Sequence, residues 1–180
     1  MAYYPDLSPY TYHLFPRDPS AIEKAYPDAR NIGWLDNSEP FPQWDTPPDA
    51  LLLKRLLAHT ILFVMLMRGY HRCQWCSGNK NEPGRNLLIY EGHEILLDNG
   101  EILVVGTDGV AFRAPVMLYH YITEHRYNPP RVFWDALQVS SPALGFDLED
   151  SERTPFSDQA YEKGRQEERR KRRAFALQLL

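Results

Sequence analysis

A series of short apolar runs separated by turns, between residues 87 and 113, constrains the fold of this chain more than any other feature. In chain order the runs are LLIY, HEILL, EILVV and VAFR. The sequences DNG (98–100) and GTDG (106–109) separate the last three runs and are typical of tight turns between strands. We therefore predict a small antiparallel β-meander. Helices must cover so small a sheet, which gives an α+β fold.

One helix is predicted before this region. The sequence TPPD (46–49) is typical of a helix N-terminus, with its threonine as the cap. Apolar residues then follow at helical spacing: Leu52, Leu53, Leu56, Leu57 and Ile61. Lys54, Arg55 and His59 fall on the other face, so we expect His59 at the solvent-exposed surface.

Two shorter helices are predicted after the meander. Residues 116–125 (VMLYHYITEH) recover a helical period, and residues 131–139 (RVFWDALQV) follow the capping sequence NPP. The predicted core, over residues 49–140, is thus a small antiparallel β-meander packed with two or three helices and carrying a zinc-knuckle loop.

Both ends of the chain differ in composition from this core. Residues 1–48 are rich in proline and aromatic residues, and we expect an extended N-terminal arm packed on the domain because disordered segments are poor in aromatics. Residues 141–180 begin with a sequence typical of a flexible linker and end in a predicted charged helix. Seven basic and three acidic residues lie between Glu162 and Arg173. We expect this helix to be isolated from the core and removable without loss of stability.

The composition is that of an ordinary globular domain. A length of 180 residues and 43% hydrophobic content allow a core without disulfides, and a net charge of −4 argues against bulk binding to nucleic acid or anionic membranes. The longest apolar run, ILFVMLM (61–67), is too short to cross a bilayer, and the N-terminus lacks a secretory signal pattern. We expect a cytoplasmic protein whose cysteines are thiols or metal ligands.

The two cysteines of the chain, Cys73 and Cys76, lie in the sequence RGYHRCQWCSG (68–78). A C-x2-C pair followed by Ser-Gly resembles a zinc knuckle, a tight turn that places two thiolates on one edge of a metal tetrahedron. A redox-active pair would instead begin a helix that lowers the thiol pKa, whereas residues 77–84 are typical of a loop. A metal site is therefore favoured over a redox disulfide.

Two thiolates need two further ligands, and three histidines are candidates. His71 lies in the knuckle loop, while His120 and His125 form an H-x4-H pair with the spacing of Cys2His2 sites. On an ideal helix His125 falls on the apolar face and His120 on the polar face, so only a loosened last turn brings both to one metal. We predict a structural zinc site of Cys73, Cys76 and two of these histidines. The alternative is two buried free cysteines with unrelated histidines.

The cluster is not accompanied by a complete catalytic motif. His93-Glu94 begins like the zinc-protease motif, but Leu97 stands where the second histidine is required. Zinc deaminases need a proline before the first cysteine, where this chain has Arg72. Phosphate-binding, nucleophile-elbow and dinucleotide-binding glycine patterns are missing as well. Whether the chain is an enzyme stays open, and a binding function is favoured.

Several segments resemble those of a group of small uncharacterised bacterial proteins. These segments are YYPDLSPYTY (3–12), NIGWLD (31–36), RGYHRCQWC (68–76), NGEILV (99–104) and AP-x3-YHYITEHRYNPP (114–130). The resemblance covers most of residues 3–137 and implies that they form one domain, with the C-terminal tail outside it. It implies no activity and supplies no catalytic residue.

We therefore expect a small zinc-stabilised binding or adaptor protein whose partner is another protein, of a kind associated with immunity or defence, and no membrane partner. Two alternatives stay open. One is a metalloenzyme with a site near Glu101 and His120, to which Asp108 and Glu124 would add polar groups. The other is nucleic-acid binding through the basic run between residues 165 and 173.

Overall fold

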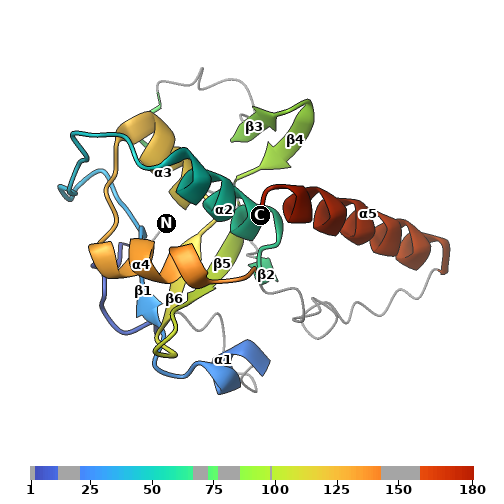
Figure 1. The fold of residues 1–180 in the computed structure, drawn as a ribbon, viewed down its shortest axis with the longest axis horizontal. Coiled ribbons are helices and arrows are strands. Elements are labelled where there is room, and N and C mark those ends of the chain that lie inside the picture. The colour runs from blue at the N-terminus through green and yellow to red at the C-terminus, as the bar shows by residue number, and fades with distance from the viewer. Residues whose placement is uncertain (1–2, 12–20, 67–72, 77–85, 98, 143–158) are drawn as a thin grey trace.

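A computed structural model gives the fold of this chain and describes residues 3–11, 21–66, 73–76, 86–97, 99–142 and 159–180. The helices are α1 (Ala21–Ala25), α2 (Ala50–Ile61), α3 (Leu118–His125), α4 (Arg131–Val139) and α5 (Gln159–Gln178). The strands are β1 (Arg30–Asn31), β2 (Met65–Leu66), β3 (Leu87–Tyr90), β4 (His93–Leu96), β5 (Gly100–Val105) and β6 (Ala111–Pro115). Helices packed on small, largely antiparallel sheets confirm the α+β class (Figure 1).

The larger sheet has the strand order β1-β6-β5-β2. Its centre is the antiparallel hairpin of β5 and β6, which the sequence predicts. β1 adds to β6 in parallel, and β2 adds to β5 antiparallel. The sequence predicts neither of these added strands, because two residues are too few to show an alternating pattern.

β3 and β4 form a separate two-stranded sheet. Glu91 and Gly92 join them with φ angles of 48° and 80°, the conformation of a two-residue hairpin turn. The four strands of the predicted meander are therefore present but divided between two sheets, since among the described strands β4 pairs with β3 alone. Alternating apolar residues predict strands, whereas strand pairing also depends on contacts between distant segments.

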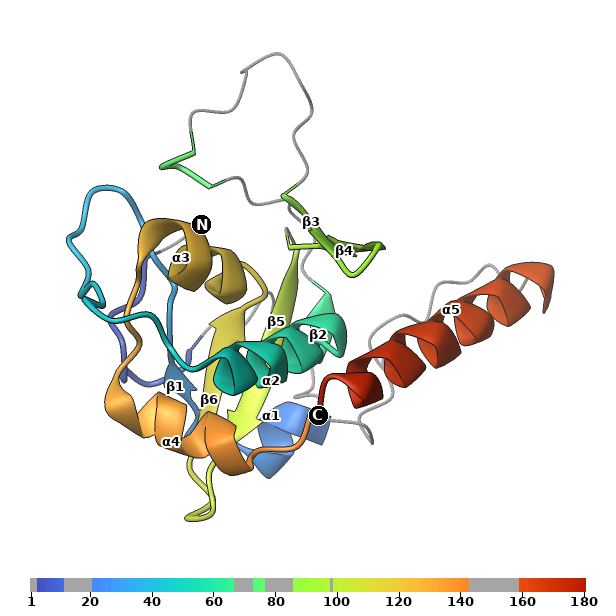
Figure 2. The same cartoon turned by 45° about the horizontal axis from the view of Figure 1, so that its top comes forward.

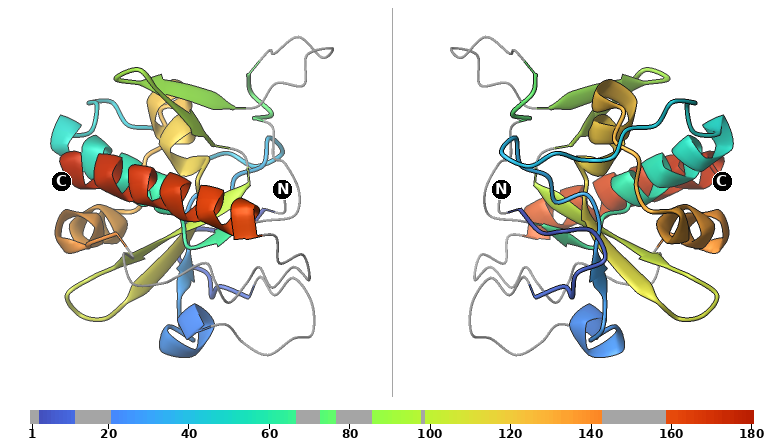
Figure 3. Two further views of the ribbon diagram at one scale, coloured as in Figure 1. Left: turned by 90° about the vertical axis from the view of Figure 1, so that its right-hand side faces the viewer. Right: turned by 90° about the vertical axis from the view of Figure 1, so that its left-hand side faces the viewer.

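Both faces of the β5–β6 hairpin are buried. Ile102 and Val104 point into an apolar cluster shared with α2, α3 and α4. Leu103 and Ala111, which alternate with them, pack instead with the N-terminal segment, including Trp34. Figure 3 shows α2 and α4 on one side of the sheet and the N-terminal segment, in dark blue, on the other. The helices and the N-terminal segment thus cover opposite faces of one sheet.

α2 begins later than the sequence analysis predicts. Its N-cap is Asp49, whose side chain accepts a hydrogen bond from the backbone amide of Leu51 at 2.6 Å. The predicted cap at Thr46 is wrong: with this cap, Pro47 would be the first helical residue, but Pro47 is itself followed by proline and is driven out of the helical region. The helix therefore starts after Pro48. α4 covers residues 131–139 as predicted.

His59 is buried in α2, with only 1% of its surface exposed, and the prediction of a solvent-exposed side chain is wrong. Its Nδ1 lies 2.9 Å from the carbonyl oxygen of Leu103, and this contact identifies Nδ1 as the donor. The polar face of α2 is covered because α4, α5 and β5 all pack around this helix. Burial lowers the pKa of His59 to about 4.

The C-terminal end of α5 packs against α2, and the prediction of an isolated helix is wrong for this end (Figure 2). Phe175, Ala176 and Leu179 are buried in the apolar cluster that contains the core of α2. The ring of Phe175 also stacks on His93 of β4, with 3.8 Å between the ring centroids. The last two turns of α5 are apolar on one side, and this side is covered by the domain.

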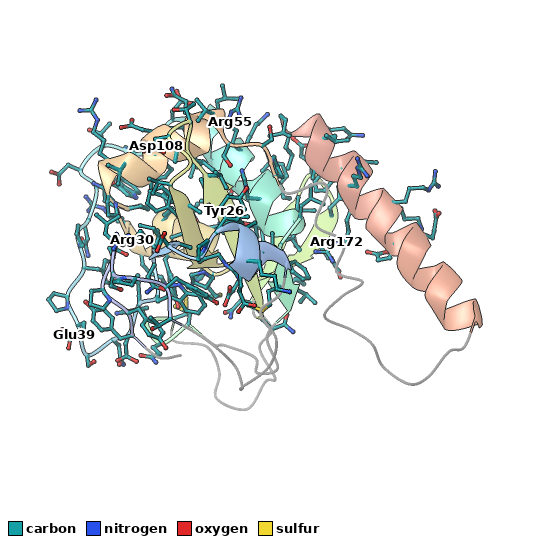
Figure 4. The ribbon with its side chains drawn as sticks, turned by 90° about the horizontal axis from the view of Figure 1, so that it is seen from below. Tyr26, Arg30, Glu39, Arg55, Asp108 and Arg172 are labelled. Atoms are coloured by element: carbon teal, nitrogen blue, oxygen red, sulfur yellow. The ribbon has the colours of Figure 1, made fainter. Side chains whose placement is uncertain are left out.

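Arg172 adds a polar contact to this packing. Its guanidinium donates to the carbonyl oxygen of Ile61 at the end of α2 and lies 4.5 Å above the ring of Phe63. Figure 4 shows Arg172 pointing from α5 toward the rest of the fold. None of the described helices, α5 included, has the length and apolar character needed to cross a membrane.

We expect Phe175→Ala to lower the free energy of unfolding by about 3–5 kcal/mol, because it removes a buried ring. Leu177, which is 48% exposed on the same helix, provides the matched control, and Leu177→Ala should cost less than about 0.5 kcal/mol. Chemical denaturation measures both. Equal losses for the two variants would show that α5 does not pack on the core.

The buried His59 should also make stability dependent on pH. Histidine in the unfolded chain takes up a proton below about pH 6.5, whereas His59 stays neutral in the folded protein down to about pH 4. The unfolded state therefore binds more protons in this interval, and stability falls as the pH is lowered through it. His59→Gln should remove this part of the pH dependence of the free energy of unfolding, as measured by denaturation at several pH values. An unchanged pH dependence would show that His59 is not its source.

Candidate metal centre

Four ligand atoms from two distant parts of the chain meet at one point. They belong to Cys73, Cys76, His120 and His125, and all lie within 4.8 Å of one another. The Nε2 atom of His125 lies 3.0 Å from Sγ of Cys73, 3.4 Å from Sγ of Cys76 and 3.2 Å from Nε2 of His120. Sγ of Cys76 lies 3.3 Å from Nε2 of His120. The turn at residues 73–76, called the knuckle turn below, and helix α3 thus contribute two potential ligands each.

Hydrogen bonding alone does not account for these distances. A neutral imidazole nitrogen is either a donor or an acceptor, and it has a single hydrogen-bonding direction in the ring plane. Nε2 of His125 has three close neighbours, so a hydrogen bond would use one of them and leave two unused. A cation at the centre of the four atoms would satisfy all of them at once. The alternative of unrelated cysteines and histidines is therefore disfavoured.

The distances agree with the edges of a metal tetrahedron. Zinc binds sulfur at about 2.3 Å and nitrogen at about 2.0–2.1 Å, which places neighbouring S and N ligands about 3.6 Å apart and two N ligands about 3.3 Å apart. The observed S–N distances are 3.0, 3.3 and 3.4 Å, and the N–N distance is 3.2 Å. These four distances each lie within about 0.6 Å of the corresponding separation around zinc.

The end of α3 explains how two histidines five residues apart reach one point. The carbonyl oxygen of Tyr121 accepts from the amides of both Arg126 and Tyr127, so the helix ends in a turn wider than an α-helical one. The carbonyl of Ile122, which Arg126 would use in a regular helix, accepts instead from the indole of Trp44 at 3.0 Å. Arg126 takes a left-handed conformation with φ of 60° and closes the helix.

The residues between the two cysteines fix the knuckle turn to the fold. Trp75 packs edge-on against Tyr121 and Phe41, with ring centroids 5.5 and 5.4 Å away. Gln74 accepts a hydrogen bond from the backbone amide of Asn37 at 2.9 Å. No motif in the sequence identifies these positioning residues, although an aromatic side chain between two ligands is a usable signal. They orient the thiols toward α3.

The protonation of the cluster suits a bound cation. Burial lowers the pKa of both His120 and His125, and the charge of His125 lowers that of His120 further, so both rings keep a free lone pair near neutral pH. Burial and the neighbouring Cys73 raise the pKa of Cys76 to about 11. A thiol with this pKa becomes a thiolate at neutral pH when a metal ion supplies positive charge.

The remaining candidate residues lie elsewhere or cannot be placed. His71 lies outside the described residues. Glu101 is fully buried on β5, where its carboxylate accepts from the Tyr10 hydroxyl at 2.8 and 2.9 Å and pairs with the Arg113 guanidinium. Burial raises the pKa of Glu101, and Arg113 opposes this shift. Asp108, labelled in Figure 4, accepts from a backbone amide in the β5–β6 turn. Neither carboxylate belongs to the four-residue cluster.

The fold and the donor set define an α+β protein with a candidate Cys2His2 metal centre. Residues 2–138 match a family described as a domain of unknown function, DUF7919, and the chain belongs to this family. This match confirms the resemblance to a family without an established activity. It includes all four cluster residues and leaves α5 outside. Neither the comparison with curated proteins nor that with solved structures gives a match.

If both α3 histidines are ligands, His120→Ala and His125→Ala should each weaken metal binding by more than about 100-fold, because each removes one of four ligand atoms. His93→Ala, on β4 and outside the cluster, serves as the control and should leave affinity unchanged. A competition titration with a chromogenic chelator measures all three. Full binding by either α3 variant would show that another ligand, such as His71, completes the site.

Proposed function

We propose that the protein is a small zinc-stabilised binding protein, with zinc held by Cys73, Cys76, His120 and His125. The observation that carries the proposal is the convergence of four sulfur and nitrogen ligand atoms within 4.8 Å. Two thiolates and two imidazoles in tetrahedral arrangement form a donor set that suits zinc. Four protein ligands complete the coordination shell and leave no position for a catalytic water, which is the arrangement of structural zinc sites.

The role of zinc in this proposal is to join the knuckle turn to α3. The two cysteines precede the two histidines by more than 40 residues, and the meander lies between them. The free energy of metal binding then contributes to folding, because the unfolded chain does not hold the four ligands together. Two further contacts support the same arrangement without the metal: Trp75 packs on Tyr121, and Gln74 accepts a hydrogen bond from the backbone amide of Asn37.

A protein partner fits this architecture better than a substrate does. Both oxygens of Glu101, the carboxylate on which a metalloenzyme would depend, are already engaged by Tyr10 and Arg113. The chain is small and carries a net charge of −4, which supports an adaptor role in a bacterial cytoplasm, with a partner associated with immunity or defence.

Nucleic-acid binding through α5 is the weaker candidate. Several of its described basic side chains are already used within the molecule: Arg170 and Lys171 lie 3.0 and 4.0 Å from the carboxylate of Glu167, and Arg172 contacts Phe63. Phosphate contacts would have to displace these pairs. Among the basic residues of α5 whose side chains the structure describes, Arg173 is exposed and is the best candidate for such a contact.

The proposal predicts about one zinc ion per chain, measured by elemental analysis of protein purified without chelator. Removing the metal, or introducing Cys76→Ser, should lower the melting temperature because one link between the turn and α3 is lost. Affinity capture from host cells with the zinc-loaded protein should recover a protein partner that survives nuclease treatment. The Cys76→Ser variant should lose this partner, while His93→Ala should retain it.

Two results would contradict the proposal. Metal-free protein with both thiols freely titratable and an unchanged melting temperature would exclude the zinc site. Recovery of nucleic acid would favour the α5 alternative if its affinity for the protein falls steeply with salt concentration. Arg173→Ala should then reduce this salt dependence.

A further inference from the structure

We propose that a pocket beside the end of α3 binds one neutral, hydroxyl-rich ring, such as a monosaccharide unit. The pocket has a volume of about 330 Å³ and is lined by residues of the 43–48 segment, Leu52 of α2, Asn128, and Trp134 of α4. None of these residues belongs to the Cys2His2 cluster. The proposal therefore adds a ligand site to the proposed function and does not depend on it.

Hydrogen bonds hold the walls of this pocket in place. The backbone amide of Trp44 donates to the carbonyl of Arg126 at 2.9 Å, and its indole donates to the carbonyl of Ile122 at 3.0 Å. The indole of Trp134 donates to the side-chain oxygen of Asn128 at 3.3 Å. Both indole N–H groups thus have partners within the protein. A ligand can therefore contact only the carbon surface of the two rings.

The pocket also contains polar groups with unused hydrogen-bonding capacity. Within the described part of the chain, the side chains of Gln43 and Thr46 make no hydrogen bond, and the side-chain nitrogen of Asn128 makes none. Together they offer amide donors, an amide acceptor and a hydroxyl that is both. A ligand that fits this set carries donors and acceptors side by side, which is a property of ring hydroxyl groups.

Charge and size narrow the ligand class. The exposed carboxylate of Asp45, which lines the pocket, disfavours an anion. The guanidinium of Arg126 is not part of the lining but lies 3.8 Å from this carboxylate, and it offsets the attraction of the carboxylate for a cation. The same guanidinium lies 5.0 Å above the ring of Trp44, so this face of the ring is already occupied by a cation. The volume is at the lower end of the range for small-molecule pockets, about 300–1,000 Å³, and fits one ring rather than a peptide. The C–H face of a sugar ring would pack on an indole ring of the pocket, and the hydroxyl groups of the sugar would bond to the side-chain amides of Gln43 and Asn128.

The four tryptophans of the chain make this proposal directly testable. In the ¹⁵N-labelled, metal-loaded full-length protein, each indole N–H gives its own NMR signal. Titration with glucose, galactose or N-acetylglucosamine to about 50 mM should shift the signals of Trp44 and Trp134, as expected for millimolar affinity. The signals of Trp34, which is 1% exposed, and of Trp75 should not move.

Variants distinguish the site from a general solvent effect. Gln43→Ala should weaken the binding of the best sugar by about three- to tenfold through loss of one hydrogen bond. Gln138→Ala, an exposed glutamine on α4 outside the pocket, is the matched control and should bind as the wild type does. Both are surface substitutions, so folding should not be affected.

Four outcomes would overturn the proposal. These are the absence of any shift with all three sugars, equal shifts of all four indole signals, unchanged affinity in Gln43→Ala, and shifts of Trp44 and Trp134 produced by tetramethylammonium chloride but not by the sugars. The last result would assign the pocket to a cation instead.

Discussion

Burial of the β5–β6 hairpin on both faces is the constraint on which the rest of the structure depends. Glu101 and Arg113 occupy one of these faces with 0% and 2% exposure, so their charges need partners inside the protein. They pair with each other, and the Tyr10 hydroxyl completes the contacts of the carboxylate. The N-terminal segment is therefore part of the core. Without it, the ion pair of Glu101 and Arg113 would be exposed to solvent and would lose the hydrogen bond from Tyr10.

The end of α3 links the candidate metal centre to the neighbouring pocket. The Trp44 indole captures the Ile122 carbonyl, and Arg126 closes the helix in a left-handed conformation. The same contacts place His125 beside the thiols and place Trp44 in the wall of the pocket. A single local departure from helical geometry thus shapes both the candidate metal centre and the pocket, and removing the Trp44 indole would affect both.

Part of the candidate site could be predicted from the sequence. The C-x2-C turn and the H-x4-H spacing are local patterns, and they identify Cys73, Cys76, His120 and His125 as candidates. Whether the two imidazoles reach one point could not be predicted, since it depends on a widened turn that Trp44 stabilises from a distant segment. The pocket is likewise formed by two distant parts of the chain, residues 43–52 and 128–134, which carry no common motif.

The sequence by itself determined the α+β class, the hairpin strands and α4, because turn residues, capping prolines and apolar periodicity act over a few neighbouring positions. Tertiary structure alone decided that β3–β4 forms its own sheet, that His59 is buried and that Phe175 anchors α5 on the core. Each of these depends on which distant segment covers a given surface. Periodicity shows which side of an element is apolar, but the burial of its other side is set by the remaining elements packed around it.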